Sequence, residues 1–185
     1  MRSFLLLSSL LLLIACNPST PAKKFISATS LIEQQIRAID TSLYSIKKYT
    51  TVDSLPTDTS YIPREDFRKE VSAFFKLPDL SDPKVAADFN EETRFDDLMK
   101  RVIISYTPAD PTKQSFQRIE LFVEPNLDAG DRVRTILATR RSGDRNGFEQ
   151  EELIWQMDRS CTSILTTQKP GGFEQIRTIK LSWNE

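Results

Sequence analysis

The stretch at residues 142–152, SGDRNGFEQEE, contains the densest set of side chains that could hold a metal ion. Five side chains here could offer oxygen ligands to Ca²⁺, namely Asp144, Asn146, Glu149, Glu151 and Glu152. Their spacing differs from that of a calcium loop, whose glycine lies about five residues after the first aspartate; here Gly147 lies three residues after Asp144. Asn146 followed by Gly147 is instead the strongest short signal for a hairpin turn. We therefore expect a solvent-exposed turn, with Asp144, Asn146 and Glu149 as weak metal candidates.

A second acidic stretch, NEETRFDD at residues 90–97, contains four carboxylates. A glycoside hydrolase needs two carboxyl groups that face each other across a cleft, and closeness in sequence does not provide this. Basic side chains gather at Arg132, Arg134 and residues 139–145. Guanidinium groups bind carboxylates and phosphates, but charges on a strand also keep an exposed edge from aggregating. We expect both stretches to be solvent-exposed surface.

Trp155 and Trp183 fall on two different predicted strands near the C-terminus. Large aromatic side chains serve either as buried anchors of a sheet or as platforms on which a ligand stacks. We expect buried anchors, and the alternative is a face that binds a ligand or a partner.

The residue types that are missing exclude several kinds of site. The chain contains no histidine, which excludes histidine-based triads, a histidine general base, a conventional zinc site and a histidine-ligated haem. Cys161 lacks a histidine to activate it, so we expect a buried free thiol. Phosphate-binding glycine motifs and CxxC are also missing, and we expect no cofactor. The net charge of −1 does not suggest a nucleic-acid partner.

The N-terminus combines Arg2, an uncharged Leu-rich run at residues 4–14, and the tetrapeptide Leu13-Ile14-Ala15-Cys16. The run is too short to span a bilayer, which takes roughly 20 apolar residues, but it fits the core of a secretory signal. This segment resembles the lipobox of bacterial lipoproteins, which signal peptidase II cuts before a lipid-modified cysteine. The resemblance covers this segment only; an ordinary signal peptide or an N-terminal anchor helix are the alternatives.

The resemblance implies that residues 1–15 are a signal peptide and that Cys16 carries the lipid, palmitate included, that anchors the protein to a membrane. Residues 16–24 then form a flexible tether, since NPSTPAKK contains two prolines and no bulky apolar residue. In the common sorting rule an aspartate after the cysteine retains a lipoprotein at the inner membrane. Asn17 therefore favours the outer membrane, and Lys23 with Lys24 favours its periplasmic face.

Residues 25–185 form a single predicted domain that begins with helices. Apolar residues at Ile32, Ile36, Ile39 and Leu43, continuing to residue 46, predict one amphipathic helix over 27–49. We expect this stripe to pack on the protein's own sheet, and a coiled-coil dimer is the alternative. A second helix is predicted to start near Pro63 and to end at Leu77-Pro78, with a buried face of Phe67, Val71, Phe74 and Phe75.

From residue 95 onward the apolar residues alternate, which predicts about six short strands separated by turn signals. We expect an α+β fold with two N-terminal helices packed on a twisted, curled antiparallel sheet in meander order. Ile103 and Ile154 break the alternation and place apolar residues on both faces, so the sheet either curls or meets a ligand or partner. The predicted strands are 102–106, 119–123, 133–139, 153–157, 162–166 and 173–183.

These features favour a membrane-anchored envelope lipoprotein that acts as a non-enzymatic binding or interaction module through its sheet face. Its partner would be an envelope protein or an apolar ligand. The alternative is a carboxylate-dependent hydrolase that acts on envelope glycan, which the surplus of Asp and Glu over Lys and Arg, 26 against 25, supports only weakly.

Overall fold

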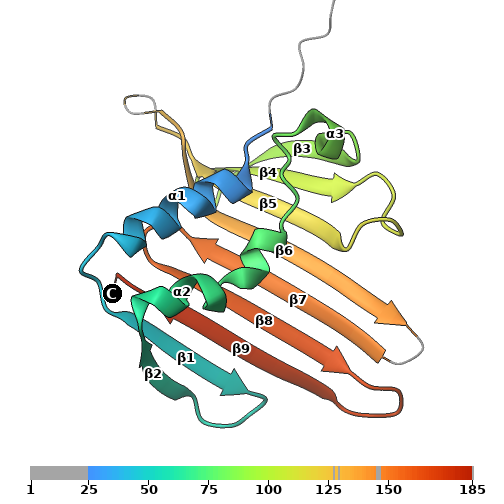
Figure 1. The fold of residues 1–185 in the computed structure, drawn as a ribbon. Coiled ribbons are helices and arrows are strands. Elements are labelled where there is room, and N and C mark those ends of the chain that lie inside the picture. Colours follow the sequence, from blue (N-terminus) through green and yellow to red (C-terminus); the bar gives the residue numbers. More distant parts are fainter. Residues whose placement is uncertain (1–24, 127, 129, 145–146, 185) are drawn as a thin grey trace, which may run out of the picture.

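The computed structural model describes residues 25–184, apart from residues 127, 129, 145 and 146, and it is a mixed α+β chain dominated by one antiparallel sheet (Figure 1). The helical segments in this part of the chain are α1 (Ala28–Asp40), α2 (Arg64–Glu70), the 3₁₀ helix η1 (Ser72–Lys76) and α3 (Pro83–Ala86). None of these described helices is long and apolar enough to cross a membrane. The strands are β1 (Ile46–Val52), β2 (Asp58–Ile62), β3 (Phe89–Asp96), β4 (Arg101–Pro108), β5 (Phe116–Glu124), β6 (Arg132–Asp144), β7 (Gly147–Gln156), β8 (Ser160–Gln168) and β9 (Glu174–Ser182).

The nine described strands lie in the order β2-β1-β9-β8-β7-β6-β5-β4-β3, so β3 to β9 form a meander and the β1–β2 hairpin is added beside β9. The six predicted strands correspond to β4–β9, and their meander order is confirmed. The expected number of about six strands is wrong. Strand β3 was missed because it coincides with the acidic stretch and exposes most of its side chains, and β2 was missed because it is exposed along its length.

The predicted helix over 27–49 is too long, because α1 ends at Asp40. Its start is fixed by Ser27, whose hydroxyl accepts a hydrogen bond from the Ser30 amide at 3.1 Å. Its end is fixed by the hydroxyl of Ser42, which donates to the Ile39 carbonyl at 2.9 Å. Leu43 is 98% exposed rather than part of the apolar stripe. The segment that follows is rich in β-branched and aromatic residues and forms β1.

The expected pair of consecutive N-terminal helices is also wrong, since the β1–β2 hairpin separates α1 from α2 in the sequence. The predicted start of the second helix is confirmed, with Pro63 directly before α2. Of its predicted buried face, Phe75 is 39% exposed because the chain tightens into a 3₁₀ helix after Val71.

The helices and the sheet share one core. Ile32, Ile36 and Ile39 of α1 are buried in the same cluster as the central strands, and α1 and α2 cross the front of the sheet in Figure 1. Strand register places one apolar row on this face, because residues paired across neighbouring strands point to the same side. That row comprises Leu121, Ile136, Trp155, Cys161 and Leu181.

We predict that Ile36→Asp abolishes the cooperative thermal melt of the protein, followed by circular dichroism. Ile36 is 0% exposed, and burying an unpaired charge costs enough to unfold a domain whose stability is about 5–15 kcal/mol. Gln34→Asp, on the exposed side of the same helix, is the matched control and should melt like the parent. A folded monomeric mutant from a dimeric parent, measured by light scattering, would instead support the coiled-coil alternative.

Candidate functional site

A pocket of about 180 Å³ lies on the helix-bearing face, between the α2–η1 segment and strands β7–β9. Two neighbouring rows of the sheet form its floor, since Glu151, Leu165 and Arg177 are paired across three strands and Ser163 is paired with Ile179. Glu70, the last residue of α2, and Phe74 of η1 form its opposite side. In Figure 1 the strands continue past α2, so the helical layer covers only part of their length.

Both carboxylates of this pocket are bound by a basic side chain. The Lys48 ammonium donates to both Glu70 oxygens at 2.7 Å. Arg140 donates to Glu151 at 2.7 Å. The Ser163 hydroxyl also donates to Glu151, at 3.2 Å. Each of the two carboxylates is therefore paired with one cation.

Arg177 is different from these four charges. Its side chain is exposed at the pocket, and in the described part of the chain its guanidinium makes no hydrogen bond or ion pair. The neighbours of Arg177 across the strands are Leu165 and Val52, which are apolar. The pocket thus combines apolar walls, two satisfied ion pairs and one cation that is available to a ligand.

The two tryptophans are buried anchors, as expected. Trp155 is 0% exposed and its ring lies 5.1 Å from that of Phe74 and 5.5 Å from that of Trp183, between centroids. Trp183 also meets Phe67 of α2 at 5.5 Å. A ligand could stack on either indole only if α2 and η1 moved away, so these residues do not form an accessible binding face.

The weak metal candidates lie at the other end of the sheet, on the β6–β7 hairpin. Glu149 is 3.7 Å from the Arg140 guanidinium, and Asp144 is paired with Gly147 at the end of the ladder. Asn146 lies outside the described residues. Among the residues that the structure describes, no group of three or more His, Cys, Asp or Glu side chains is arranged to hold a metal ion.

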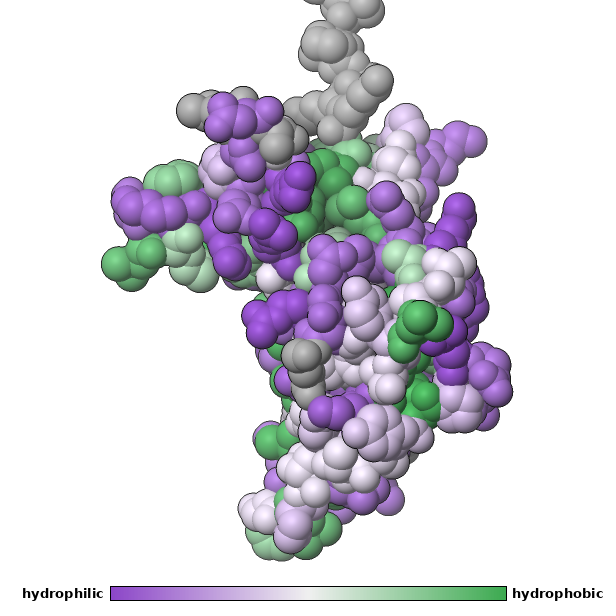
Figure 2. Space-filling view, turned by 90° about the vertical axis from the view of Figure 1, so that its left-hand side faces the viewer, coloured by the Kyte–Doolittle hydropathy of each residue, from purple (hydrophilic) through white to green (hydrophobic). Residues whose placement is uncertain are grey.

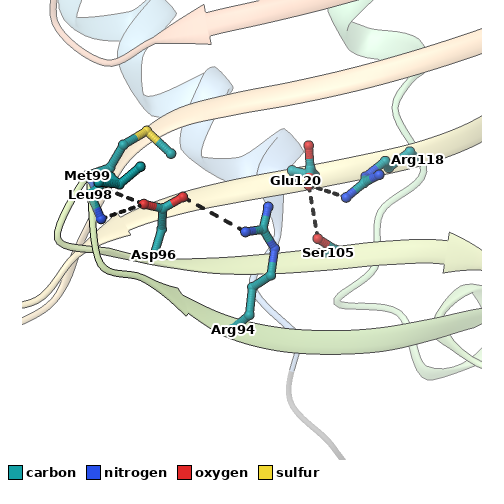
Figure 3. A network of polar contacts seen from close by, with 7 residues as sticks. All are labelled: Arg94, Asp96, Leu98, Met99, Ser105, Arg118 and Glu120. Atoms are coloured by element: carbon teal, nitrogen blue, oxygen red, sulfur yellow. Dashed lines mark hydrogen bonds and ion pairs between the residues drawn. The ribbon is translucent and has the colours of Figure 1, made fainter.

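The acidic stretch at residues 90–97 forms the edge strand β3 and the start of its turn, where its charges serve the local structure (Figure 3). Asp96 accepts hydrogen bonds from the backbone amides of Leu98 and Met99 at 3.0 and 2.9 Å and lies 3.9 Å from Arg94. Figure 3 also shows the neighbouring carboxylate of Glu120 turned toward the side chains of Ser105 and Arg118. These contacts fix the β3–β4 turn and the adjacent strands.

Ile103 is one of the two apolar residues that break the alternation of apolar and polar side chains along the strands, and it lies on the same sheet face as Glu120. Ile103 and Ser105 share the sheet face opposite the helices, together with Glu120. Ile103 is 0% exposed yet does not belong to the main core. This part of the second face is therefore closed by side chains of the sheet itself.

Exposed apolar residues are spread over the molecule. Leu43, Leu98 and Phe173 are each more than 95% exposed and lie in three different turns. Figure 2 shows the apolar surface on one side as separate areas between hydrophilic ones. Scattered apolar residues are normal for a protein surface and do not by themselves indicate a docking site.

Two buried titratable groups outside the pocket are held neutral. Burial raises the pKa of the Cys161 thiol, and the expected buried free thiol is confirmed. Burial, followed by the negative charge of Glu91, raises the pKa of Tyr106 to about 12. Cys16, the predicted lipidation site, lies outside the described residues.

From the sequence, Glu151 was considered only as an oxygen ligand in an exposed turn, and none of the charged residues was assigned to a pocket. Two of them could have been found from periodicity, because Glu151 alternates with Leu153 and Trp155, and Arg177 alternates with Ile179 and Leu181. A charged residue on the apolar side of a strand indicates a partner or a cavity. Lys48 could not have been found this way, since its segment was assigned to a helix.

We predict that Arg140→Met lowers the free energy of unfolding by about 2 kcal/mol, because it leaves the buried Glu151 without its cation. Arg134→Met is the matched control: Arg134 pairs with Glu124 on the surface, where an ion pair contributes at most about 1 kcal/mol. Chemical denaturation measures both. Equal losses in the two variants would contradict a buried role for the Arg140–Glu151 pair, and adding Glu151→Gln to Arg140→Met should recover part of the loss.

The pocket over β7–β9 is our candidate site, and its chemistry suits a small ligand with both apolar and charged parts. No protein-family model, no curated protein and no solved structure matches this chain.

Proposed function

We propose that this chain is a lipid-anchored protein of the bacterial envelope that binds a small ligand in the pocket over β7–β9 and does not transform it. The lipobox-like segment ending at Cys16 supports the anchor, Asn17 supports the outer membrane, and Lys23 with Lys24 supports its periplasmic face. The observation that carries the binding function is the pocket itself, with apolar walls and an available Arg177. An envelope protein that docks on the sheet remains the other kind of partner.

The state of the pocket carboxylates supports binding rather than catalysis. A general acid–base mechanism needs a side chain that exchanges protons with the substrate. The oxygens of Glu70 and Glu151 already accept hydrogen bonds from Lys48, Arg140 and Ser163. Breaking these bonds would leave a partly buried charge without its counter-ion.

A carboxylate-dependent hydrolase of envelope glycan is the second candidate, because Glu70 and Glu151 line the same pocket. A volume of about 180 Å³ is small for such a substrate, since pockets for drug-sized ligands measure roughly 300–1,000 Å³. Release of sugar from purified envelope glycan that is lost in both Glu70→Gln and Glu151→Gln would favour this candidate over binding.

We predict that the protein incorporates radiolabelled palmitate and that Cys16→Ser abolishes the label and leaves a slower-migrating precursor. The reason is that signal peptidase II cuts only after the cysteine has been modified. Cys161→Ser is the control and should keep the label, because that thiol is buried in the core. Label that persists in Cys16→Ser would contradict the lipoprotein assignment while leaving the pocket untouched.

We predict that the full chain, purified from membranes in lipid discs, carries a small molecule that solvent extraction and mass spectrometry detect. Ala73→Leu should remove it, because Ala73 lines the pocket and a larger side chain there fills the space. Ser72→Leu, which changes the adjacent exposed residue, should retain it. If the extracts of the parent protein and of Ala73→Leu contain the same small molecules, the result would count against ligand binding in the pocket.

A further inference from the structure

The carboxylates that line the pocket are each paired with a cation, and Arg140 also lies 3.7 Å from Glu149, which is outside the pocket lining. Glu70 is balanced by Lys48 and Glu151 by Arg140, each at 2.7 Å. The remaining charge is that of Arg177, whose guanidinium has no partner in the part of the chain that the structure describes. A ligand that enters this pocket therefore meets one unneutralised cation.

Arg177 is placed to bind the polar end of a ligand. Glu151 and Arg177 lie two strands apart in the same row. Strands are spaced about 4.8 Å apart, so their backbones are about 10 Å from each other and Glu151 is not a direct partner. Leu165 lies between them in the row, and exposure increases from Glu151 to Arg177. The cation thus lies at the mouth of the pocket, where guanidinium groups bind carboxylates with two parallel hydrogen bonds.

The inner part of the pocket suits a short apolar tail. Phe74 and Leu181 are buried, and Leu165 and Ile179 are half-buried, and all four line the space. Its volume of about 180 Å³ equals that of about six water molecules at about 30 Å³ each, or a chain of about six carbon atoms. A long acyl chain would not fit inside, and a fully polar ligand would leave the apolar walls without contacts.

We propose that the ligand of this pocket is an amphipathic carboxylate with an apolar tail of about six carbon atoms, whose carboxylate binds Arg177. This inference rests on the proposed binding function and names its ligand class. The tail contacts Phe74, Leu165 and Ile179, and the two ion pairs keep Glu70 and Glu151 from repelling the anionic head.

Equilibrium dialysis of radiolabelled hexanoate against the full chain in lipid discs, with empty discs subtracted, tests this assignment. Arg177→Gln should weaken hexanoate binding about tenfold, the effect of losing one charge-assisted hydrogen-bonded contact. Lys180→Gln is the matched control, because it removes the same charge from the opposite face of β9 and should leave binding unchanged. Hexanol should bind more weakly than hexanoate, and Arg177→Gln should not alter its binding.

The outcomes separate this inference from the proposed function. Hexanoate binding that is equal in the parent and in Arg177→Gln overturns the role of Arg177. If hexanol binds as tightly as hexanoate and Ala73→Leu abolishes its binding, the anionic ligand class is overturned. The pocket then still stands as a binding site. If the parent protein carries an extractable small molecule but does not bind hexanoate, the proposed ligand class is overturned and the binding function is not. No hexanoate binding together with no extracted molecule overturns both.

Discussion

The packing of Phe67 and Phe74 on the two tryptophans is the interaction on which the helical layer depends. Phe74 meets Trp155 edge to face at 5.1 Å, Phe67 meets Trp183 at 5.5 Å, and the two indoles lie 5.5 Å apart. Such pairs contribute about 0.5–1.5 kcal/mol each beyond the area that they bury. The helix α2 has 7 residues and would not be stable alone, since isolated helices shorter than about 12 residues are marginal in water. Its position is therefore set by the sheet.

The same cluster determines where the pocket lies. Phe74 is both an anchor on Trp155 and a wall of the pocket, so the open space begins where the aromatic contacts end. This aromatic packing has a cost, because the buried indole N–H of Trp155 finds no hydrogen-bond partner among the described residues. An unsatisfied buried donor costs about 1–3 kcal/mol. The ring contacts of Trp155 with Phe67, Phe74 and Trp183 contribute stability that offsets such a cost.

The sequence predicted the parts of the fold in which local preference and tertiary position agree. The start of α2 follows from Pro63 and two acidic residues, and β4–β9 follow from their alternation. Strand β1 was misassigned because Ile46 extends the apolar spacing of α1 by coincidence, and only pairing with β9 decides its conformation. Strand β3 is stabilised by its ladder with β4 rather than by an apolar face. The pocket lay beyond prediction, since its floor depends on the register of three strands.

Lys48 shows how the register of the sheet and the charge of the pocket are linked. It is paired with Leu181, so its side chain points to the helix-bearing face and reaches Glu70 at the end of α2. A slip of one residue between β1 and β9 would turn Lys48 to the opposite face. A slip in one direction would place Tyr49 opposite Leu181 and leave Glu70 without a cation, whereas a slip in the other direction would place Lys47 there. A partly buried ion pair contributes little net stability compared with apolar packing, but losing one partner is costly, so such pairs can select a single arrangement. In this chain the β1–β9 ladder brings Lys48 to Glu70, and the pair neutralises that carboxylate, which leaves Arg177 to determine the charge of the proposed ligand.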